Sequence, residues 1–77
     1  MSRLSDAQFN ALASEVYTFI KGQQEGASPF KIAKLDCIQQ LRFGRAVRRR
    51  ILRQLLEDGL ICQEGTRRST LYRHTTY

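Results

Sequence analysis

The segment between residues 42 and 53 contains six arginines, and it predicts one long amphipathic helix. At about 100° per residue, three apolar side chains of this segment share one face: Val47, Ile51 and Leu55. The opposite face carries four basic side chains: Arg42, Arg45, Arg49 and Arg53. One side of the helix is therefore suited to burial, and the other to contact with a negatively charged partner.

The residues that follow predict a hairpin. Gly59 is expected to end the arginine-rich helix, which should span about residues 44–58, because glycine readily adopts the left-handed conformation found at helix ends. Residues 60–64 and 70–75 are expected to form two strands around a turn at 65–69. We expect four side chains to form the apolar side of this hairpin: Leu60, Cys62, Leu71 and Tyr72.

The N-terminal half predicts two further helices. Ser5 and Gln8 have the spacing of a capping box, and Leu4 and Phe9 that of a hydrophobic staple, ahead of a helix that ends near Gly22. Residues 23–27 are expected to be a loop. Ser28 and Pro29 then start a short helix that includes residues 30–35. Residues 36–43 leave two alternatives: an additional turn of helix that starts at Asp36, or a second helix that continues towards Leu41.

The expected architecture is therefore a single α+β domain over residues 1–77, mainly α-helical, with three helices and a C-terminal β-hairpin. Its charge is uneven. Residues 1–40 contain four basic and four acidic residues, whereas residues 41–77 contain nine basic and three acidic residues, so the second half accounts for the whole net charge of +6. A basic half joined to a neutral half indicates a polyanionic partner that binds from one side.

Several classes of protein are disfavoured. No apolar segment approaches the ~20 residues of a membrane-spanning helix, and the N-terminus has no apolar core of a signal peptide, so we expect a cytoplasmic protein. Cys37, Cys62 and His74 have no zinc-site spacing, and both cysteines are expected to be buried, unreactive thiols. We expect no metal, no cofactor and no enzymatic activity, since no catalytic or phosphate-loop motif is present.

Three segments in this order resemble the winged helix-turn-helix family of small bacterial transcriptional regulators, such as those of fimbrial operons. The segment ASPFKIAKL resembles the second helix of that family. The segment AVRRRILRQLLEDGLI resembles its recognition helix and the junction into the hairpin, and EGTRRSTLYRHT resembles its wing and the returning strand. The resemblance covers roughly residues 5–76. It departs from the family pattern between Ile32 and Val47, where the chain is about one turn longer. It implies a winged helix-turn-helix fold and sequence-specific binding of double-stranded DNA, in a bacterial or mobile-element regulator associated with the nucleoid.

In that interpretation the helix at 44–58 enters the major groove, and residues near its start contact base edges. The expected base contacts come from Arg42 and Arg45, with Gln40 added if the helix begins earlier. Arg49 and Arg53 are expected to contact phosphates. Arg48 and Arg50 are expected at the two flanks of the basic face of this helix. The remaining expected DNA contacts are Lys31 and Lys34 on the second helix, and Arg67 and Arg68 at the wing tip, on the backbone or minor groove.

The sequence leaves open the class of binding partner and the oligomeric state. A basic helix can also dock an acidic protein or an RNA, so a winged-helix module for protein–protein or RNA contact is the alternative function. A single domain of this size contacts few base pairs, so useful specificity favours a homodimer or a cooperative array on DNA.

Overall fold

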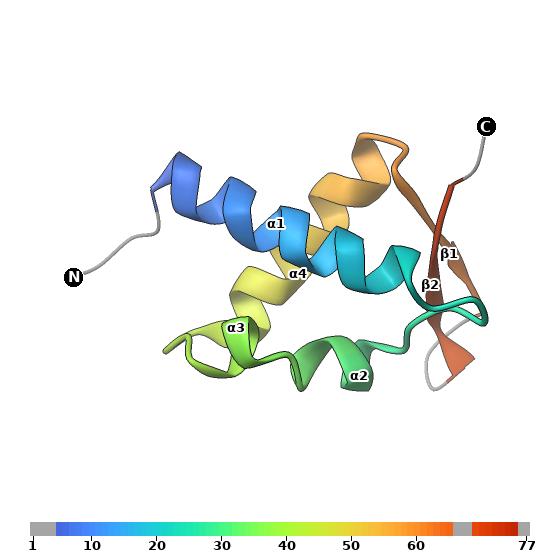
Figure 1. The fold of residues 1–77 in the computed structure, drawn as a ribbon, viewed down its shortest axis with the longest axis horizontal. Helices are drawn as coiled ribbons and strands as arrows, with labels where there is room; N and C mark the ends of the chain where they lie inside the picture. Colours follow the sequence, from blue (N-terminus) through green and yellow to red (C-terminus); the bar gives the residue numbers. More distant parts are fainter. Residues whose placement is uncertain (1–4, 66–68, 76–77) are drawn as a thin grey trace.

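The computed structural model describes residues 5–65 and 69–75, which form a mainly helical domain with a C-terminal hairpin (Figure 1). The elements in chain order are α1 (Asp6–Lys21), α2 (Pro29–Ala33), α3 (Asp36–Gln39), α4 (Gly44–Glu57), β1 (Ile61–Glu64) and β2 (Leu71–His74). The α+β class and the antiparallel hairpin are confirmed. The expectation of three helices is wrong, because the described residues form four.

Helix α1 begins as its sequence predicts. The Gln8 N–H donates to Ser5 Oγ at 3.1 Å, and the Ser5 N–H donates to Gln8 Oε1 at 3.0 Å, which completes the capping box. The helix ends at Lys21, with Gly22 as its C-cap. Leu4, the expected first residue of the staple, lies outside the described residues.

The additional helix is α3, and it results from a break at Leu35. Helix α2 starts after Ser28, whose Oγ accepts a hydrogen bond from the Lys31 N–H at 3.3 Å. Leu35 then adopts an extended conformation, with φ −61° and ψ 134°, and the chain starts a new turn of helix at Asp36. Of the two alternatives for residues 36–43, the extra turn is therefore confirmed and a continuous second helix is wrong.

Helix α4 starts at Gly44, directly after a residue with a non-helical backbone. Phe43 has φ −118° and ψ 49°, so Arg42 lies in the preceding turn, and its expected place on the arginine-rich helix is wrong. Gly44 is also tightly placed, since a Cβ atom there would lie 2.6 Å from the carbonyl oxygen of Ile38. The other end agrees with the sequence, because Gly59 has φ 73° and follows the last turn.

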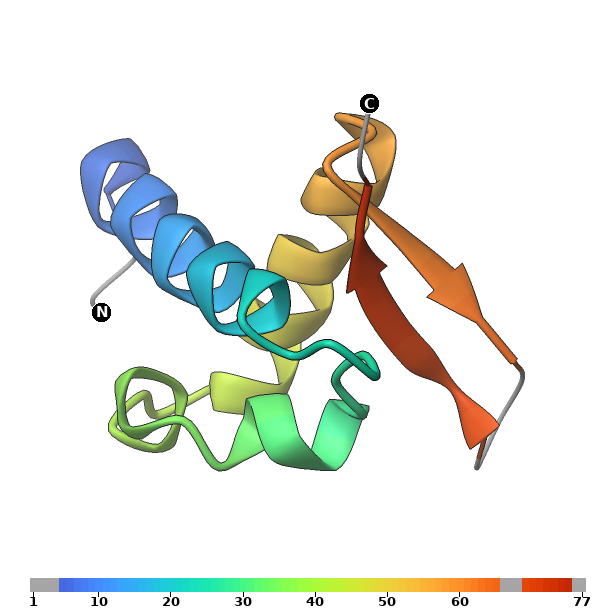
Figure 2. The ribbon, with the colours of Figure 1, turned by 45° about the vertical axis from the view of Figure 1, so that its right-hand side comes forward.

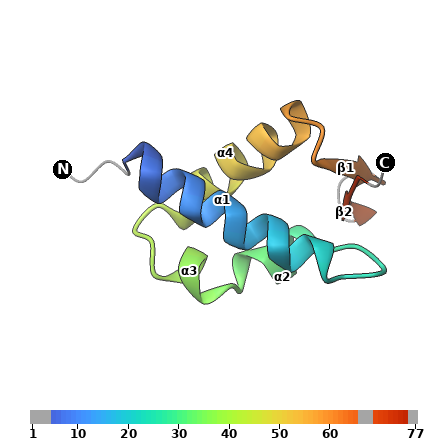
Figure 3. The ribbon, with the colours of Figure 1, turned by 45° about the horizontal axis from the view of Figure 1, so that its top comes forward.

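Helix α4 organises the packing of the domain. It crosses behind α1 in Figure 1 and contacts α1, α2, α3 and β1 (Figures 2 and 3). The buried side chains come from every helix, from the segment between α1 and α2, and from the start of the hairpin: Val16, Ile20, Ala27, Ile32, Ile38, Ile51, Leu52, Leu55 and Ile61. Within the described residues, no helix is both long enough and apolar enough to cross a bilayer.

The segment between α1 and α2 connects the hairpin to the helices through backbone pairing. Strands β1 and β2 pair antiparallel, with Ile61 opposite His74 and Glu64 opposite Leu71. Ala27, in the segment expected to be a simple loop, exchanges two backbone hydrogen bonds of 2.8 Å with Tyr72. Strand β2 therefore lies between Ala27 and β1, and Tyr72 packs against the core as a half-buried residue.

The expected apolar face of the hairpin is wrong on both strands. On β1, Ile61 is the buried side chain, whereas Leu60 is 41% exposed and Cys62 is exposed. Because side chains alternate across a strand, the burial of Ile61 turns both of its neighbours outward. On β2, Leu71 lies on the other face from Tyr72, and it is absent from the residues that pack against the core.

Candidate nucleic-acid interface

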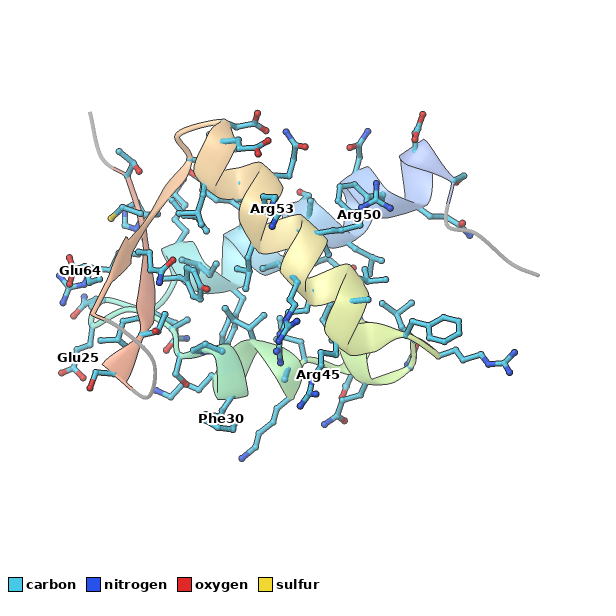
Figure 4. The ribbon with its side chains drawn as sticks, turned by 180° about the vertical axis from the view of Figure 1, so that it is seen from behind. Glu25, Phe30, Arg45, Arg50, Arg53 and Glu64 are labelled. Atoms are coloured by element: carbon cyan, nitrogen blue, oxygen red, sulfur yellow. The ribbon has the colours of Figure 1, made fainter. Side chains whose placement is uncertain are left out.

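The outer face of α4 is lined by arginines, as its periodicity predicts. Arg45, Arg49 and Arg53 are exposed, while Ile51, Leu52 and Leu55 of the same helix are buried. Figure 4 shows Arg53 on the side of α4 that faces away from α1, and Arg45 at the end near α2 and α3. The helix thus packs against the core through its apolar face, and it presents its basic face to solvent.

The charges of α4 run against its own dipole. Its first turn contains Arg45 and no acidic residue, its last turn contains no basic residue, and Glu57 and the C-cap Asp58 lie at its C-terminus. Helix α1 has the opposite and favourable arrangement, with Asp6 in its first turn and Lys21 in its last. A cation near a helix N-terminus is destabilising by tenths of a kcal/mol, so the arrangement in α4 is better suited to binding an anion than to stabilising the helix.

The first amides of α4 also have no side-chain cap. Phe43 occupies the N-cap position and cannot accept a hydrogen bond through its side chain. The first backbone bond within the helix runs from the Val47 N–H to the Phe43 carbonyl oxygen at 3.0 Å. The start of α4 therefore adds a partial positive charge to that of the arginines around it.

No carboxylate neutralises this basic face within the part of the chain that the structure describes. The ion pair found there joins Arg73 Nε to Glu64 Oε2 at 3.4 Å and belongs to the hairpin. At the far end of α4, Asp58 accepts a hydrogen bond from Gln54 Nε2 at 3.0 Å. The arginines of α4 are therefore free of salt bridges to the described acidic side chains.

Two of the predicted site residues point elsewhere. The Arg50 guanidinium lies over the ring of Phe9, 5.1 Å from its centroid, and Figure 4 shows it reaching over α1. Arg48 is half-buried, and its Nε is buried with no hydrogen-bond partner among the described residues. Its position at the side of Leu52 and Leu55 indicates that its aliphatic stem covers the core.

The turn before α4 brings three predicted residues to one place. Arg42, Arg45 and Arg49 line a concavity of about 490 Å³ together with Phe43, Gly44 and Ala46. Gln40 is exposed as the C-cap of α3 and does not line this concavity. The earlier helix start on which its role depended is not observed.

The other predicted contacts lie on neighbouring elements. Lys31 and Lys34 are exposed, on α2 and at its C-cap respectively. Arg67 and Arg68, the predicted wing-tip contacts, lie outside the described residues. The described part of the interface therefore consists of the α4 outer face, the turn before it and the lysines of α2.

Two exposed phenylalanines at the surface near α4 were not among the candidate site residues that the sequence indicated. Phe30 on α2 is 77% exposed and Phe43 is 66% exposed. Phe43 lies four residues before Val47 and continues the spacing of the apolar face, so the sequence signal for its exposure is only its position directly before Gly44. The signal for Phe30 is weaker, because Phe30 fits the expected second helix and only its packing shows that it faces solvent.

The cysteines differ from each other. Cys62 is exposed, so its expected burial is wrong. Cys37 is partly covered, and desolvation, together with the neighbouring Glu15 carboxylate, raises its pKa to about 11. Among the described residues no group of three or more His, Cys, Asp or Glu side chains is placed to hold a metal ion.

Comparisons with known protein families, with curated proteins and with solved structures find no match to this chain.

Proposed function

We propose that this protein binds double-stranded DNA in a sequence-specific manner, with α4 in the major groove. The observation that carries the proposal is the outer face of α4, where Arg45, Arg49 and Arg53 are exposed and lack described carboxylate partners. In addition, Arg45 lies in the first turn, where a cation opposes the helix dipole. Such a face is unfavourable for the free helix and favourable beside a phosphate backbone.

The roles of the arginines follow from their positions along α4. Arg45 lies in the first turn, where a helix in the major groove meets base edges, and a guanidinium can donate two hydrogen bonds to guanine O6 and N7. Arg49 and Arg53 lie one and two turns further on and would neutralise phosphates. Lys31 and Lys34 on α2 would contact the backbone beside the same groove.

A winged helix-turn-helix arrangement is part of this proposal. Helices α2 and α3 precede α4, and the hairpin of β1 and β2 follows it, which is the order that such a domain requires. The extra chain between Ile32 and Val47 forms α3 and the turn at residues 40–43. In this arrangement the hairpin is the wing, and Arg67 and Arg68 would contact the backbone or the minor groove.

Acting through DNA occupancy, such a protein would serve as a small transcriptional regulator on the nucleoid. A single helix contacts few base pairs, so a homodimer or a cooperative array would supply the specificity that one domain lacks.

The proposal is tested by competition. Fluorescence anisotropy of a labelled duplex is measured while unlabelled duplex DNA, single-stranded RNA or polyglutamate is added at equal charge concentration. We expect duplex DNA to compete best, and log K to fall linearly with log salt concentration. Better competition by RNA or by polyglutamate would favour the alternative function, docking of an RNA or an acidic protein.

A further inference from the structure

We propose that Phe43 stacks on a nucleobase that has left the duplex, so that the protein prefers DNA with an unpaired base next to the groove occupied by α4. This inference rests on the proposed function, because it places the unpaired base on DNA already bound by α4. It assigns a ligand to the Phe43 side of the concavity at the start of α4, which has no role in the contacts proposed for paired bases.

The exposure of Phe43 is the first observation. Its side chain is 66% exposed, and it is absent from the apolar residues that pack against the core. Leu41, two residues before it, and Val47, four residues after it, do pack there. The chain therefore turns the flanking apolar side chains inward and leaves the phenyl ring at the surface.

The position of Phe43 is the second observation. As the N-cap of α4 it replaces the Ser, Thr, Asp or Asn that would hydrogen-bond to the first amides, and such caps contribute typically ~1 kcal/mol. Helices α1 and α2 of the same chain both have a serine at this position, and each serine makes the capping bond, whereas the four-residue α3 starts after Leu35, which is half-buried and packs against the core. A ring that is neither buried nor able to cap needs another reason to be there.

The surroundings of the ring decide the chemistry of its ligand. The Arg42 guanidinium lies over the ring, 5.6 Å from its centroid, and Arg45 and Arg49 line the same concavity of about 490 Å³. This volume lies within the ~300–1,000 Å³ typical of ligand sites. The lining residues include no acidic side chain. An aromatic face surrounded by arginines matches a nucleotide, whose base stacks and whose phosphate is anionic.

An intact duplex cannot use this surface fully. Its bases have both faces covered by their neighbours, so a base must leave the stack before an aromatic side chain can cover it. Since Arg45 and Arg49 belong both to the concavity and to the outer face of α4, the unpaired base would lie at the edge of the same DNA-binding surface.

The test compares three duplexes of one sequence: fully paired, with a single bulged adenine, and with an abasic nucleotide at the bulge. Base stacking on an aromatic residue is worth ~1–3 kcal/mol by alanine substitution, so we expect the adenine bulge to bind at least about fivefold more tightly than the other two. Phe43→Ala should remove that difference, whereas Phe43→Tyr should retain it.

Phe30→Ala is the matched control, because Phe30 is at least as exposed but does not line the concavity. It should retain the preference for the adenine bulge. Equal binding of all three duplexes by the wild-type protein, or an unchanged preference in Phe43→Ala, would overturn the inference while leaving the proposed function intact. Failure of the wild-type protein to bind even the paired duplex would instead count against the proposed function, and the inference would fall with it.

Discussion

The guanidinium of Arg50 lies 5.1 Å from the centroid of the Phe9 ring and thereby connects α4 to α1. Both Arg50 and its sequence neighbour Arg49 are exposed, but Arg49 makes no such ring contact among the described residues and lines the concavity at the start of α4. Two adjacent arginines of equal charge therefore have different structural roles, and they form a matched pair for mutagenesis.

Replacing Arg50 by alanine should lower stability more than it lowers DNA affinity. Loss of an exposed cation–π contact costs ~0.5–1 kcal/mol, which urea unfolding monitored by circular dichroism can measure. Arg49→Ala should leave the free energy of unfolding nearly unchanged, because its side chain is exposed. A drop in stability for Arg49→Ala equal to that for Arg50→Ala would show that the two arginines are not distinguished in this way.

Replacing Arg49 or Arg53 by alanine should weaken binding to all duplexes about equally. If each side chain neutralises one phosphate, the slope of log K against log salt concentration should become shallower by about one unit per substitution. Gln54→Ala, an exposed and uncharged position on the same helix, is the control and should leave the slope unchanged. A slope unaffected by either arginine substitution would remove this face from the DNA interface.

Gly44→Ala should destabilise the domain, whereas Gly22→Ala should not. A Cβ atom at residue 44 would lie 2.6 Å from the Ile38 carbonyl oxygen, and overpacking of this kind typically costs ~1–3 kcal/mol. At residue 22 the nearest atom is the Phe19 carbonyl oxygen at 3.5 Å and φ is −77°, so alanine fits and should contribute ~0.4–1 kcal/mol. Equal effects of the two substitutions on the urea midpoint would contradict the close contact between α3 and α4.

Cys62 should react with iodoacetamide at pH 8 much faster than Cys37, because Cys62 is exposed whereas the pKa of Cys37 is raised to about 11. At that pH only about one Cys37 side chain in a thousand would be a thiolate, which is the reactive form. Labelling of Cys37 should increase as the pH rises towards 11, since the thiol then ionises. Peptide mapping by mass spectrometry gives both rates, and urea should make them similar. Comparable rates in the folded protein would refute the assigned environment of Cys37.

The parts of the fold governed by local chemistry could be predicted from the sequence. The cap at Ser5, the start at Ser28 and the end at Gly59 depend on neighbouring residues, and all three are confirmed. The break at Leu35 depends on packing between helices, so residues 36–43 left two alternatives. The pairing of Ala27 with Tyr72 joins residues far apart in the chain and has no local signal.

The candidate site was predictable in its charge but not in its detail. The spacing of Arg45, Arg49 and Arg53 alone placed them on one exposed face, because a regular helix fixes their directions. The direction of Arg50 depends on where α1 crosses α4, and the exposure of Phe43 depends on how the turn before α4 is folded. Tertiary contacts, which a single sequence does not show, decide both.

The central claim is that α4 recognises base pairs, and selection from a random duplex library tests it most directly. The wild-type protein and Arg45→Ala are each used to retain duplexes, which are then sequenced. The wild-type protein should enrich a defined sequence, and Arg45→Ala should relax the preference at specific positions while losing ~1–3 kcal/mol on the best site. Retention of no preferred sequence by the wild-type protein would contradict the claim.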